Sequence, residues 1–227
     1  MVQLLTVILS CEKNMHLWPS LLSKNIERML ILCGKPLEGD YAFDLDDRVL
    51  YLDCSDGYEG LPEKMIYAYN AICEHKRFDG ITHIMKLDDH DTIFSKNVID
   101  NIEKNGQGLL DRYHYVGQHV YSSCVGGHHI GKCGTSPWNK KLYEGENGMY
   151  ASGGYSYILS RTALDIIRNA YTYSDKERIR REHIYEDLMV AMILKKHDIF
   201  PVRAYYGIRS TDPIYQGSIP AIGRQRN

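Results

Sequence analysis

The sequence predicts an α/β fold in a single domain, with a mostly parallel central sheet flanked by helices. The chain has 227 residues, of which 44% are hydrophobic and 25% charged, a composition typical of a globular domain with a sizeable core. Short apolar runs of strand length alternate with segments whose apolar residues recur at helical spacing. Such alternation favours a mostly parallel sheet with helices on both faces.

The expected strands are apolar runs bounded by polar residues or turns. They cover Leu4–Leu9, Met29–Cys33, Val49–Leu52, His83–Leu87, Tyr155–Leu159 and Ile199–Val202. In a sheet of this kind, ligands gather at the carboxyl ends of the strands. Residues that directly follow a strand are therefore the first candidates for a functional site.

The expected helices lie between these strands. Pro62 can open the first one, because proline is favoured at the first helical position. Met65, Ala68, Tyr69, Ile72 and Cys73 then share one apolar face. Three further helices are expected over Ser95–Lys104, Arg161–Tyr171 and Glu186–Lys196.

Charge and hydropathy exclude some functional classes. The net charge of -2 and the pI near 6.5 give no reason to expect a nucleic-acid partner, which would require a clustered excess of Lys and Arg. The short basic run Glu177–Arg181 is interleaved with acids and is interpreted as a solvated helix face. No apolar segment is long enough to span a membrane, and the opening Val2–Ser10 is too short for a signal peptide. We therefore expect a soluble, cytoplasmic protein.

The six cysteines are scattered and form no C-x-x-C pair, so neither a disulfide framework nor a structural zinc site is indicated. The segment with Cys124, His128, His129 and Cys133 could suggest zinc, but its spacing matches no common site. A glycine-rich surface loop is the preferred interpretation.

The segment Lys86–Phe94, KLDDHDTIF, concentrates negative charge where a buried strand ends. Neighbouring carboxylates repel one another and raise one another's pKa unless a cation lies among them. A helix cap would explain one aspartate, but three aspartates are better explained by a hard divalent ion, Mn²⁺ or Mg²⁺, that binds substrate phosphates. This pattern alone does not separate glycosyl transfer from nucleotidyl transfer or phosphate hydrolysis.

Several common catalytic motifs are absent from the sequence. There is no G-x-x-x-x-G-K-[ST] loop and no G-x-G-x-x-G after the first strand, which argues against a P-loop enzyme and a nicotinamide dehydrogenase. A G-x-S-x-G nucleophile elbow is also missing. If phosphates bind, a metal must carry much of their charge.

Four motifs in order resemble the galactosyltransferase-like glycosyltransferases, which include the β-1,3-galactosyltransferases and the Fringe proteins. They are Asp53–Tyr58 followed by Glu63 and Lys64, KLDDHDTIF, Asn147–Ser160 (NGMYASGGYSYILS) and Ile184–Val202. The resemblance runs from about residue 45 to residue 203. It implies a compact soluble member, as in bacteria or large DNA viruses, without the membrane anchor of the Golgi relatives.

The resemblance implies a single-domain A-type glycosyltransferase fold. It also implies an inverting enzyme that moves a hexose, galactose or glucose, from a UDP-sugar to a glycan or other hydroxyl acceptor. A metal, usually Mn²⁺, would bridge the donor diphosphate to the aspartates and stabilise the charge on the leaving group. The nucleotide-sugar half would comprise residues 1–110 and the acceptor half residues 111–227.

Inversion in one step needs a general base opposite the leaving group. The family's "EDV" tripeptide corresponds to Glu186, Asp187 and Leu188, so Asp187 is the expected base and Glu186 a second catalytic candidate. The alternative is that both acids only favour the start of a helix, since acids in the first turn complement the helix dipole.

The remaining site residues follow from the same resemblance. Because His90 occupies the third place of the family's acidic triplet, the metal pair is either Asp89 and Asp91, which is preferred, or Asp88 and Asp89. Asp212 or water is expected in place of the family's later histidine, since no histidine follows His197. The expected donor-binding residues are Ser10, Asp56, Lys64, Asp88, Ser152, Gly153 and Gly154. For Lys64 a solvated helix face is equally credible, and for Ser152–Gly154 a simple tight turn.

Aromatic side chains in the long segment before the Ser-Gly-Gly turn could contribute to the acceptor site. Trp138 or Tyr150 could stack on a sugar, or pack in the interior instead. Two other functions remain open: a non-catalytic nucleotide-sugar or carbohydrate-binding protein, and a metal-dependent nucleotidyltransferase, which would need no base at Asp187.

Overall fold

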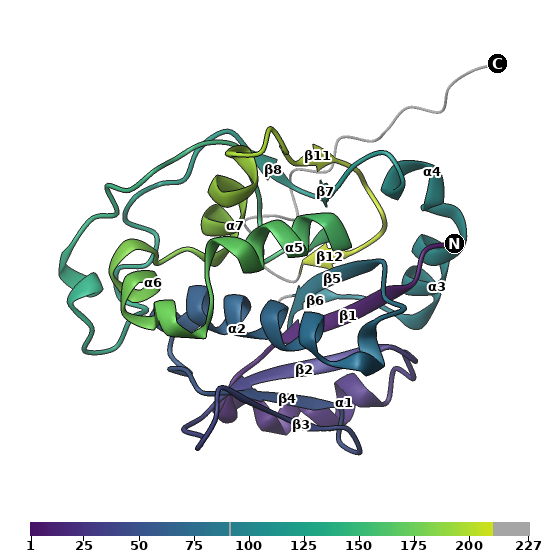
Figure 1. Ribbon diagram of the computed structural model, residues 1–227, viewed down its shortest axis with the longest axis horizontal. Helices are drawn as coiled ribbons and strands as arrows, with labels where there is room; N and C mark the ends of the chain where they lie inside the picture. Colours follow the sequence, from purple (N-terminus) through teal and green to yellow (C-terminus); the bar gives the residue numbers. More distant parts are fainter. Residues whose placement is uncertain (91, 211–227) are drawn as a thin grey trace.

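The computed structural model describes residues 1–90 and 92–210. Over these residues, the central sheet has eight strands in the order β11-β7-β10-β5-β1-β2-β4-β3 (Figure 1). Its strands are β1 (Leu4–Leu9), β2 (Met29–Gly34), β3 (Tyr41–Asp44), β4 (Val49–Leu52), β5 (His83–Asp88), β7 (Tyr115–Gly117), β10 (Tyr157–Ser160) and β11 (Val202–Arg203). Two small two-stranded sheets pair β6 (Thr92–Ile93) with β12 (Arg209–Ser210), and β8 (Val120–Tyr121) with β9 (Tyr150–Ala151).

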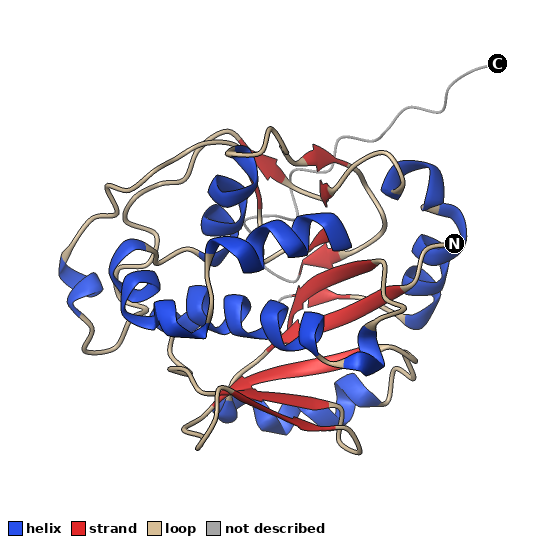
Figure 2. Cartoon of the chain, viewed as in Figure 1, coloured by secondary structure: helices blue, strands red, loops and turns tan. Residues whose placement is uncertain are grey.

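Helices cover both faces of the sheet (Figure 2). The α-helices are α1 (Trp18–Leu22), α2 (Leu61–Glu74), α3 (Lys96–Asn105), α4 (Gln107–Leu110), α5 (Arg161–Ala170), α6 (Lys176–Glu182) and α7 (Glu186–Lys195). Short 3₁₀ helices are η1 (Glu12–Leu17), η2 (Tyr58–Gly60), η3 (Lys76–Phe78), η4 (Pro137–Lys140) and η5 (Tyr173–Asp175). In the described part of the chain, no helix is long and apolar enough to cross a bilayer.

The predicted α/β fold is confirmed, and its parallel core lies in the first half of the chain. β1 pairs in parallel with β2 and β5, and β2 pairs in parallel with β4. β10 is antiparallel to both of its neighbours, β5 and β7, and β3 is an antiparallel edge strand. The sheet is therefore mixed: it has a parallel part around β1 and a further parallel pair, β7 with β11, at its other edge.

Strand β1 shows how the sequence builds two cores. Its residues alternate in direction, as side chains of a strand must. Leu5 and Val7 belong to the core that also contains residues of α2, α5 and α7, whereas Leu4 and Ile8 belong to the core with residues of α1 and α3. Because both faces are buried, the strand is a continuous apolar run.

The expected elements are present, with shifts at some boundaries. The strand expected over Tyr155–Leu159 begins two residues later, at Tyr157, because Ser156 has a φ of 114° and this left-handed conformation does not continue a strand. The strand expected over Ile199–Val202 is only Val202–Arg203. β3 and β7 were not expected from the sequence.

Two helices differ from expectation in their burial. α2 has no solvated face along most of its length, since every residue from Pro62 to Cys73 is buried. α6 includes the basic run that was interpreted as a solvated helix face, and this interpretation is wrong for part of it. Ile179 is buried, and Arg180 lies 2.7 Å from a carboxylate oxygen of the buried Glu63.

Candidate active site

The carboxyl ends of β1, β2 and β5 meet at one edge of the sheet, because these strands are parallel. Ser10 follows β1, Gly34 ends β2, and Asp88 and Asp89 stand at the end of β5. The register places Leu9 beside Asp88. Side chains that are far apart in the sequence are thereby collected at the edge where ligands bind in such sheets.

Asp89 is held by neighbours on three sides. Ser10 Oγ donates to Asp89 Oδ2 at 2.5 Å, and Asn14 Nδ2 donates to the same oxygen at 2.9 Å. His90 Nδ1 lies 2.6 Å from Oδ1, and only 2% of the Asp89 side chain is exposed. Burial raises the pKa of Asp89, but the hydrogen bonds from His90, Ser10 and Asn14 outweigh it, so the pKa is lowered.

Ser10 is itself anchored, because Trp18 Nε1 donates to its hydroxyl at 2.8 Å. Its hydroxyl is thus occupied on both sides, and the residue is buried. The contacts place Ser10 beside the acidic segment as a support for Asp89.

Lys64 and Asp56 form a second support at this edge. Lys64 Nζ lies 2.6 Å from Asp56 Oδ1 and donates to the carbonyl of Ser10 at 2.7 Å, and none of its side chain is exposed. Asp56 also accepts from the backbone N–H groups of Gly34 and Glu12. The solvated-face alternative for Lys64 is therefore wrong, because its ammonium ties α2 to the ends of β1 and β2.

Lys86 is the residue of this region that the motif analysis passed over. Its ammonium lies in the interior, 2.6 Å from Asp88 Oδ1 and 3.0 Å from Glu186 Oε1, and it donates to the carbonyl of Gly153 at 3.0 Å. Burial lowers the pKa of Lys86, but Asp88 and Glu186 outweigh this effect and raise it. A lysine inside the apolar run of β5 was the signal, because a buried ammonium needs such partners.

Glu186 occupies the interior side of Lys86. It is buried, with Oε1 facing the ammonium and Oε2 accepting from the Tyr157 hydroxyl at 2.8 Å. Tyr157 in turn lies 2.8 Å from the hydroxyl of Tyr69. Burial raises the pKa of Glu186 to about 7. Both carboxylate oxygens thus have partners inside the protein.

Asp187 points toward the Ser-Gly-Gly turn. It is half-buried, and its Oδ2 accepts from the Gly153 N–H at 3.0 Å. Its Oδ1 accepts from the N–H of Leu188 at 2.8 Å. Burial raises the pKa of Asp187, although the Gly153 N–H and the Lys86 ammonium act against it.

The close packing of the Ser-Gly-Gly turn explains why glycine is needed at position 153. A Cβ there would lie 2.0 Å from Glu186 Oε1 and 2.9 Å from Lys86 Nζ. At Gly154 a Cβ would have only an ordinary contact, 3.7 Å from Asp88 Oδ2. Ser152 donates its N–H to the carbonyl of His119. The turn is therefore packed onto the Lys86–Glu186 pair through Gly153, while Gly154 is exposed.

Several tyrosines lie near enough to Asp187 for its charge to act on them, and most of them were not expected from the sequence. The negative charge of Asp187 contributes to raising the pKa of Tyr58, Tyr150 and Tyr185, in each case after burial as the main cause. The ring of Tyr150 lies 5.7 Å from that of Tyr121 across the β8–β9 pair. These hydroxyl-bearing rings come from separate segments, so only the fold could bring them together.

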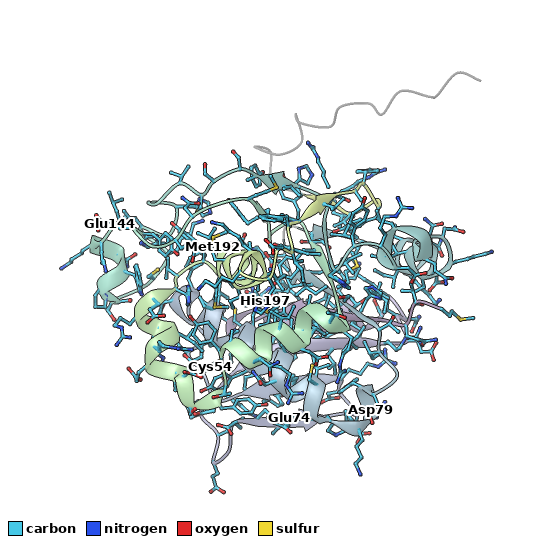
Figure 3. All side chains as sticks on the ribbon, turned by 45° about the horizontal axis from the view of Figure 1, so that its top comes forward. Cys54, Glu74, Asp79, Glu144, Met192 and His197 are labelled. Atoms are coloured by element: carbon cyan, nitrogen blue, oxygen red, sulfur yellow. The ribbon has the colours of Figure 1, made fainter. Side chains whose placement is uncertain are left out.

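Trp138 is engaged in packing. Its Nε1 donates to the carbonyl of Arg180, and its ring meets that of His129 edge to face at 5.7 Å. These contacts favour the interior-packing alternative for this residue. Glu144 marks the outer edge of the same long loop in Figure 3.

The histidine and cysteine segment of this loop is held by hydrogen bonds. His129 is buried, with Nδ1 2.7 Å from the Tyr185 hydroxyl and Nε2 2.9 Å from the carbonyls of Trp138 and Lys141. Its two ring nitrogens thus have partners within the loop and at Tyr185, the residue before α7. Over residues 1–90 and 92–210, no three His, Cys, Asp or Glu side chains group as a metal site.

The last expectations concern two metal ligands, Asp91 and Asp212, and the position of His197 at a helix end. Asp91 and Asp212 lie outside the described residues, so their part of the predicted site stays a prediction. His197 lies just past the end of α7, and Figure 3 labels it together with Met192 of that helix. It is exposed, and residues 188–196, most of them helical, separate it from Asp187 at the other end of α7.

The comparisons with known proteins bear on the whole of this arrangement. A search of curated proteins found no match. A family model described as Galactosyltransferase matches residues 34–204, which include Asp56, Lys64, the acidic end of β5, the Ser-Gly-Gly turn and Asp187. Since this match covers well over half of the chain, the protein belongs to the galactosyltransferase family.

Proposed function

We propose that the protein is an inverting, metal-dependent glycosyltransferase that moves a hexose, galactose or glucose, from a UDP-sugar to a hydroxyl group of a glycan or other acceptor. The observation that carries the proposal is the position of Asp187. Its half-buried carboxylate is fixed by the Gly153 N–H, and the Lys86 ammonium connects this turn to the acidic end of β5.

Asp187 is the general base in this proposal. Displacement with inversion requires that a base on the face opposite the leaving group takes the proton of the acceptor hydroxyl. Burial raises the pKa of Asp187, which makes its carboxylate a better proton acceptor than an exposed aspartate. Its partial exposure leaves it open to an acceptor, whereas Glu186 is enclosed.

The acidic segment is assigned to the donor side, and its described residues fit a divalent cation in part. Asp88 has 22% of its side chain exposed, and within the described chain its Oδ2 accepts no hydrogen bond. Asp89 already accepts bonds on both oxygens. Carboxylate oxygens are the ligands that Mn²⁺ and Mg²⁺ prefer.

We therefore assign Asp88 to the metal group together with the expected ligands Asp89 and Asp91. A bound cation would supply neutralisation of the charge that develops on the leaving diphosphate. The protein itself contributes the orientation of these carboxylates: Lys86 holds Asp88, and Ser10 and Asn14 hold Asp89.

The acceptor side is assigned to the tyrosines around Asp187. Tyr150 comes three residues before Gly153, on β9, and is half-buried. An aromatic ring can cover the apolar face of a sugar, while its hydroxyl makes hydrogen bonds. Tyr150 and Tyr58 are thus the side chains that we expect to contact the acceptor beside the base.

The proposal is tested by combining a melting experiment with a transfer assay. UDP-galactose and UDP-glucose should raise the melting temperature in Mn²⁺ and not in EDTA, because a ligand that binds only the folded state stabilises it. The same donor should then be consumed in the presence of a panel of glycan acceptors. An equal shift in EDTA would refute metal dependence, and binding without transfer or hydrolysis would favour a non-catalytic binding protein.

A further inference from the structure

Four residues at the junction of β5, the Ser-Gly-Gly turn and α7 form a closed ring of contacts. Glu186 Oε1 lies 3.0 Å from Lys86 Nζ, Lys86 Nζ donates to the Gly153 carbonyl at 3.0 Å, and the Gly153 N–H donates to Asp187 Oδ2 at 3.0 Å. Asp187 follows Glu186 in the chain, which closes the ring. A closed ring restrains each member more than an open chain of the same contacts would.

The ring is packed as tightly as its backbone allows. Gly153 leaves no room for a side chain, because a Cβ would lie 2.0 Å from Glu186 Oε1. Glu186 is also held from behind, by the Tyr157 hydroxyl at 2.8 Å. The position of the Gly153 peptide is thus set by a buried ion pair on one side and by the Asp187 carboxylate on the other.

We propose that Lys86 and Glu186 are positioning residues, which hold the Asp187 carboxylate in its reactive orientation through the Gly153 peptide. This inference rests on the proposed function, in which Asp187 is the base. Neither residue touches the acceptor in this scheme, because Lys86 and Glu186 are both buried beneath the turn.

The Lys86 ammonium connects the donor side of the proposed site with its acceptor side. Lys86 Nζ lies 2.6 Å from Asp88 Oδ1 as well as 3.0 Å from Glu186 Oε1. A single cation therefore orients a donor-side carboxylate and, through Gly153, the acceptor-side base. The relative placement of donor and base depends on one buried side chain.

The test compares two buried glutamates in equivalent settings. Glu186 and Glu63 both lie in the first turn of a helix, both are buried, and each faces a cationic side chain, Lys86 or Arg180. Only Glu186 belongs to the ring. Glu186→Gln and Glu63→Gln therefore make the same chemical change in a buried ion pair, with and without a connection to Asp187.

We expect Glu186→Gln to lower kcat by about 10- to 100-fold, the loss that a misplacement of roughly 1 Å causes. The affinity for the UDP-sugar should change little, because Glu186→Gln keeps the contact between Lys86 and the donor-side Asp88. The Gly153 amide resonance in NMR spectra should shift, since that N–H bonds to Asp187. Glu63→Gln should lower the melting temperature and leave kcat and the Gly153 resonance unchanged.

The outcomes separate the inference from the proposed function. A Glu186→Gln variant with wild-type kcat, measured well below its melting temperature, or with an unmoved Gly153 resonance would overturn the inference. A wild type that neither transfers nor hydrolyses a donor would overturn the proposed function. The Gly153 resonance would then decide alone whether the pair orders Asp187.

Tyr157→Phe provides a second variant in case Glu186→Gln does not fold. It removes only the hydroxyl that donates to Glu186 and lies beside Tyr69. We expect the same effects as for Glu186→Gln, but with smaller changes: a lower kcat, an unchanged donor affinity and a shifted Gly153 resonance. Normal turnover in a folded Tyr157→Phe variant, with the resonance in its wild-type place, would count against the inference.

Discussion

The ammonium of Lys86 lies 3.0 Å from a carboxylate oxygen of Glu186, and both side chains are almost completely buried. Removal of one partner of such a pair leaves an uncompensated charge in the interior, which is costly. The pair therefore belongs to the framework of the site, and it joins β5 to the start of α7.

The Asp187→Asn variant separates a catalytic role from a helix-dipole role. Asparagine keeps the shape and can still accept from the Gly153 N–H, but it cannot take a proton from the acceptor. Transfer should fall by about 10²–10⁴-fold, the usual contribution of general-base catalysis, while donor affinity changes little. Steady-state kinetics and a binding titration with the same UDP-sugar measure both quantities.

The melting temperature of Asp187→Asn completes this comparison. If Asp187 only complemented the helix dipole, the variant would lose about 1 kcal/mol or less of stability and turn over normally once folded. Full activity in the variant would thus refute the assignment of the base. Asp111→Asn, at an exposed aspartate remote from the site, serves as the control for the substitution itself.

Asp88 and Asp89 should respond differently to replacement by asparagine. Asp89 is buried and its pKa is lowered by three hydrogen bonds, so its ionised form stabilises the fold. Asp89→Asn should therefore cost about 1–3 kcal/mol of unfolding free energy, as expected for charge-assisted bonds. Thermal or urea unfolding of the metal-free protein measures this loss.

Asp88→Asn should mainly affect ligand binding. Its side chain is partly exposed and has an oxygen that is open toward a cation, so the Mn²⁺-dependent shift with a UDP-sugar should shrink. Without metal, Asp88→Asn should lower the free energy of unfolding less than Asp89→Asn does. A large loss of metal-free stability together with a normal Mn²⁺-dependent shift would contradict the assignment of Asp88 to the metal group.

The pH dependence of stability should carry the signature of Glu186. Burial raises its pKa from 4.5 to about 7, with Lys86, Asp187 and Tyr157 as its polar neighbours. The folded state then holds a proton that the unfolded state has lost, so stability falls as pH rises from about 4.5 through 7. The contribution amounts to up to about 3 kcal/mol for a shift of this size.

Unfolding curves at several pH values test this expectation. Glu186→Gln should not show this loss of stability with rising pH. The difference in unfolding free energy between wild type and variant should therefore change between about pH 4.5 and 7. A difference that stays constant from pH 4.5 to 7.5 would show that Glu186 titrates alike in the folded and unfolded states.

Gly153→Ala and Gly154→Ala form a matched pair. A methyl group at position 153 would meet Glu186 Oε1 at 2.0 Å, whereas at position 154 its nearest neighbour would be Asp88 Oδ2 at 3.7 Å. Gly153→Ala should cost about 1–3 kcal/mol through overpacking and lower the transfer rate. Gly154→Ala should be close to neutral in unfolding experiments.

A double variant tests whether the clash is the cause. Glu186→Ala creates space beside position 153, so Gly153→Ala should be less destabilising in that background than in the wild type. Contacting residues are expected to show such non-additive behaviour. Purely additive effects on the unfolding free energy would argue that the two positions do not meet.

Much of the fold could be predicted from the sequence because it depends on local patterns. The continuous apolar run of β1 indicates a strand buried on both faces, and Pro62 marks the start of α2. The acidic segment after β5 indicated which edge of the sheet carries the site. The ordered motifs from Asp56 to Asp187 indicated the family, which the match over residues 34–204 confirms.

Other features depended on partners distant in the sequence. Lysine side chains are usually solvated. Only the tertiary structure shows that Lys64 and Lys86 are buried, because Asp56, Asp88 and Glu186 supply the opposite charges. Glu186 and Asp187 are adjacent acids of one helix turn, which the sequence treats alike. In the fold one faces the interior ammonium and the other the open turn, because neighbouring residues of a helix point in different directions. The chain thus carries the family's residues in its order, while packing alone decides which of these carboxylates is enclosed and which one is partly exposed at the turn.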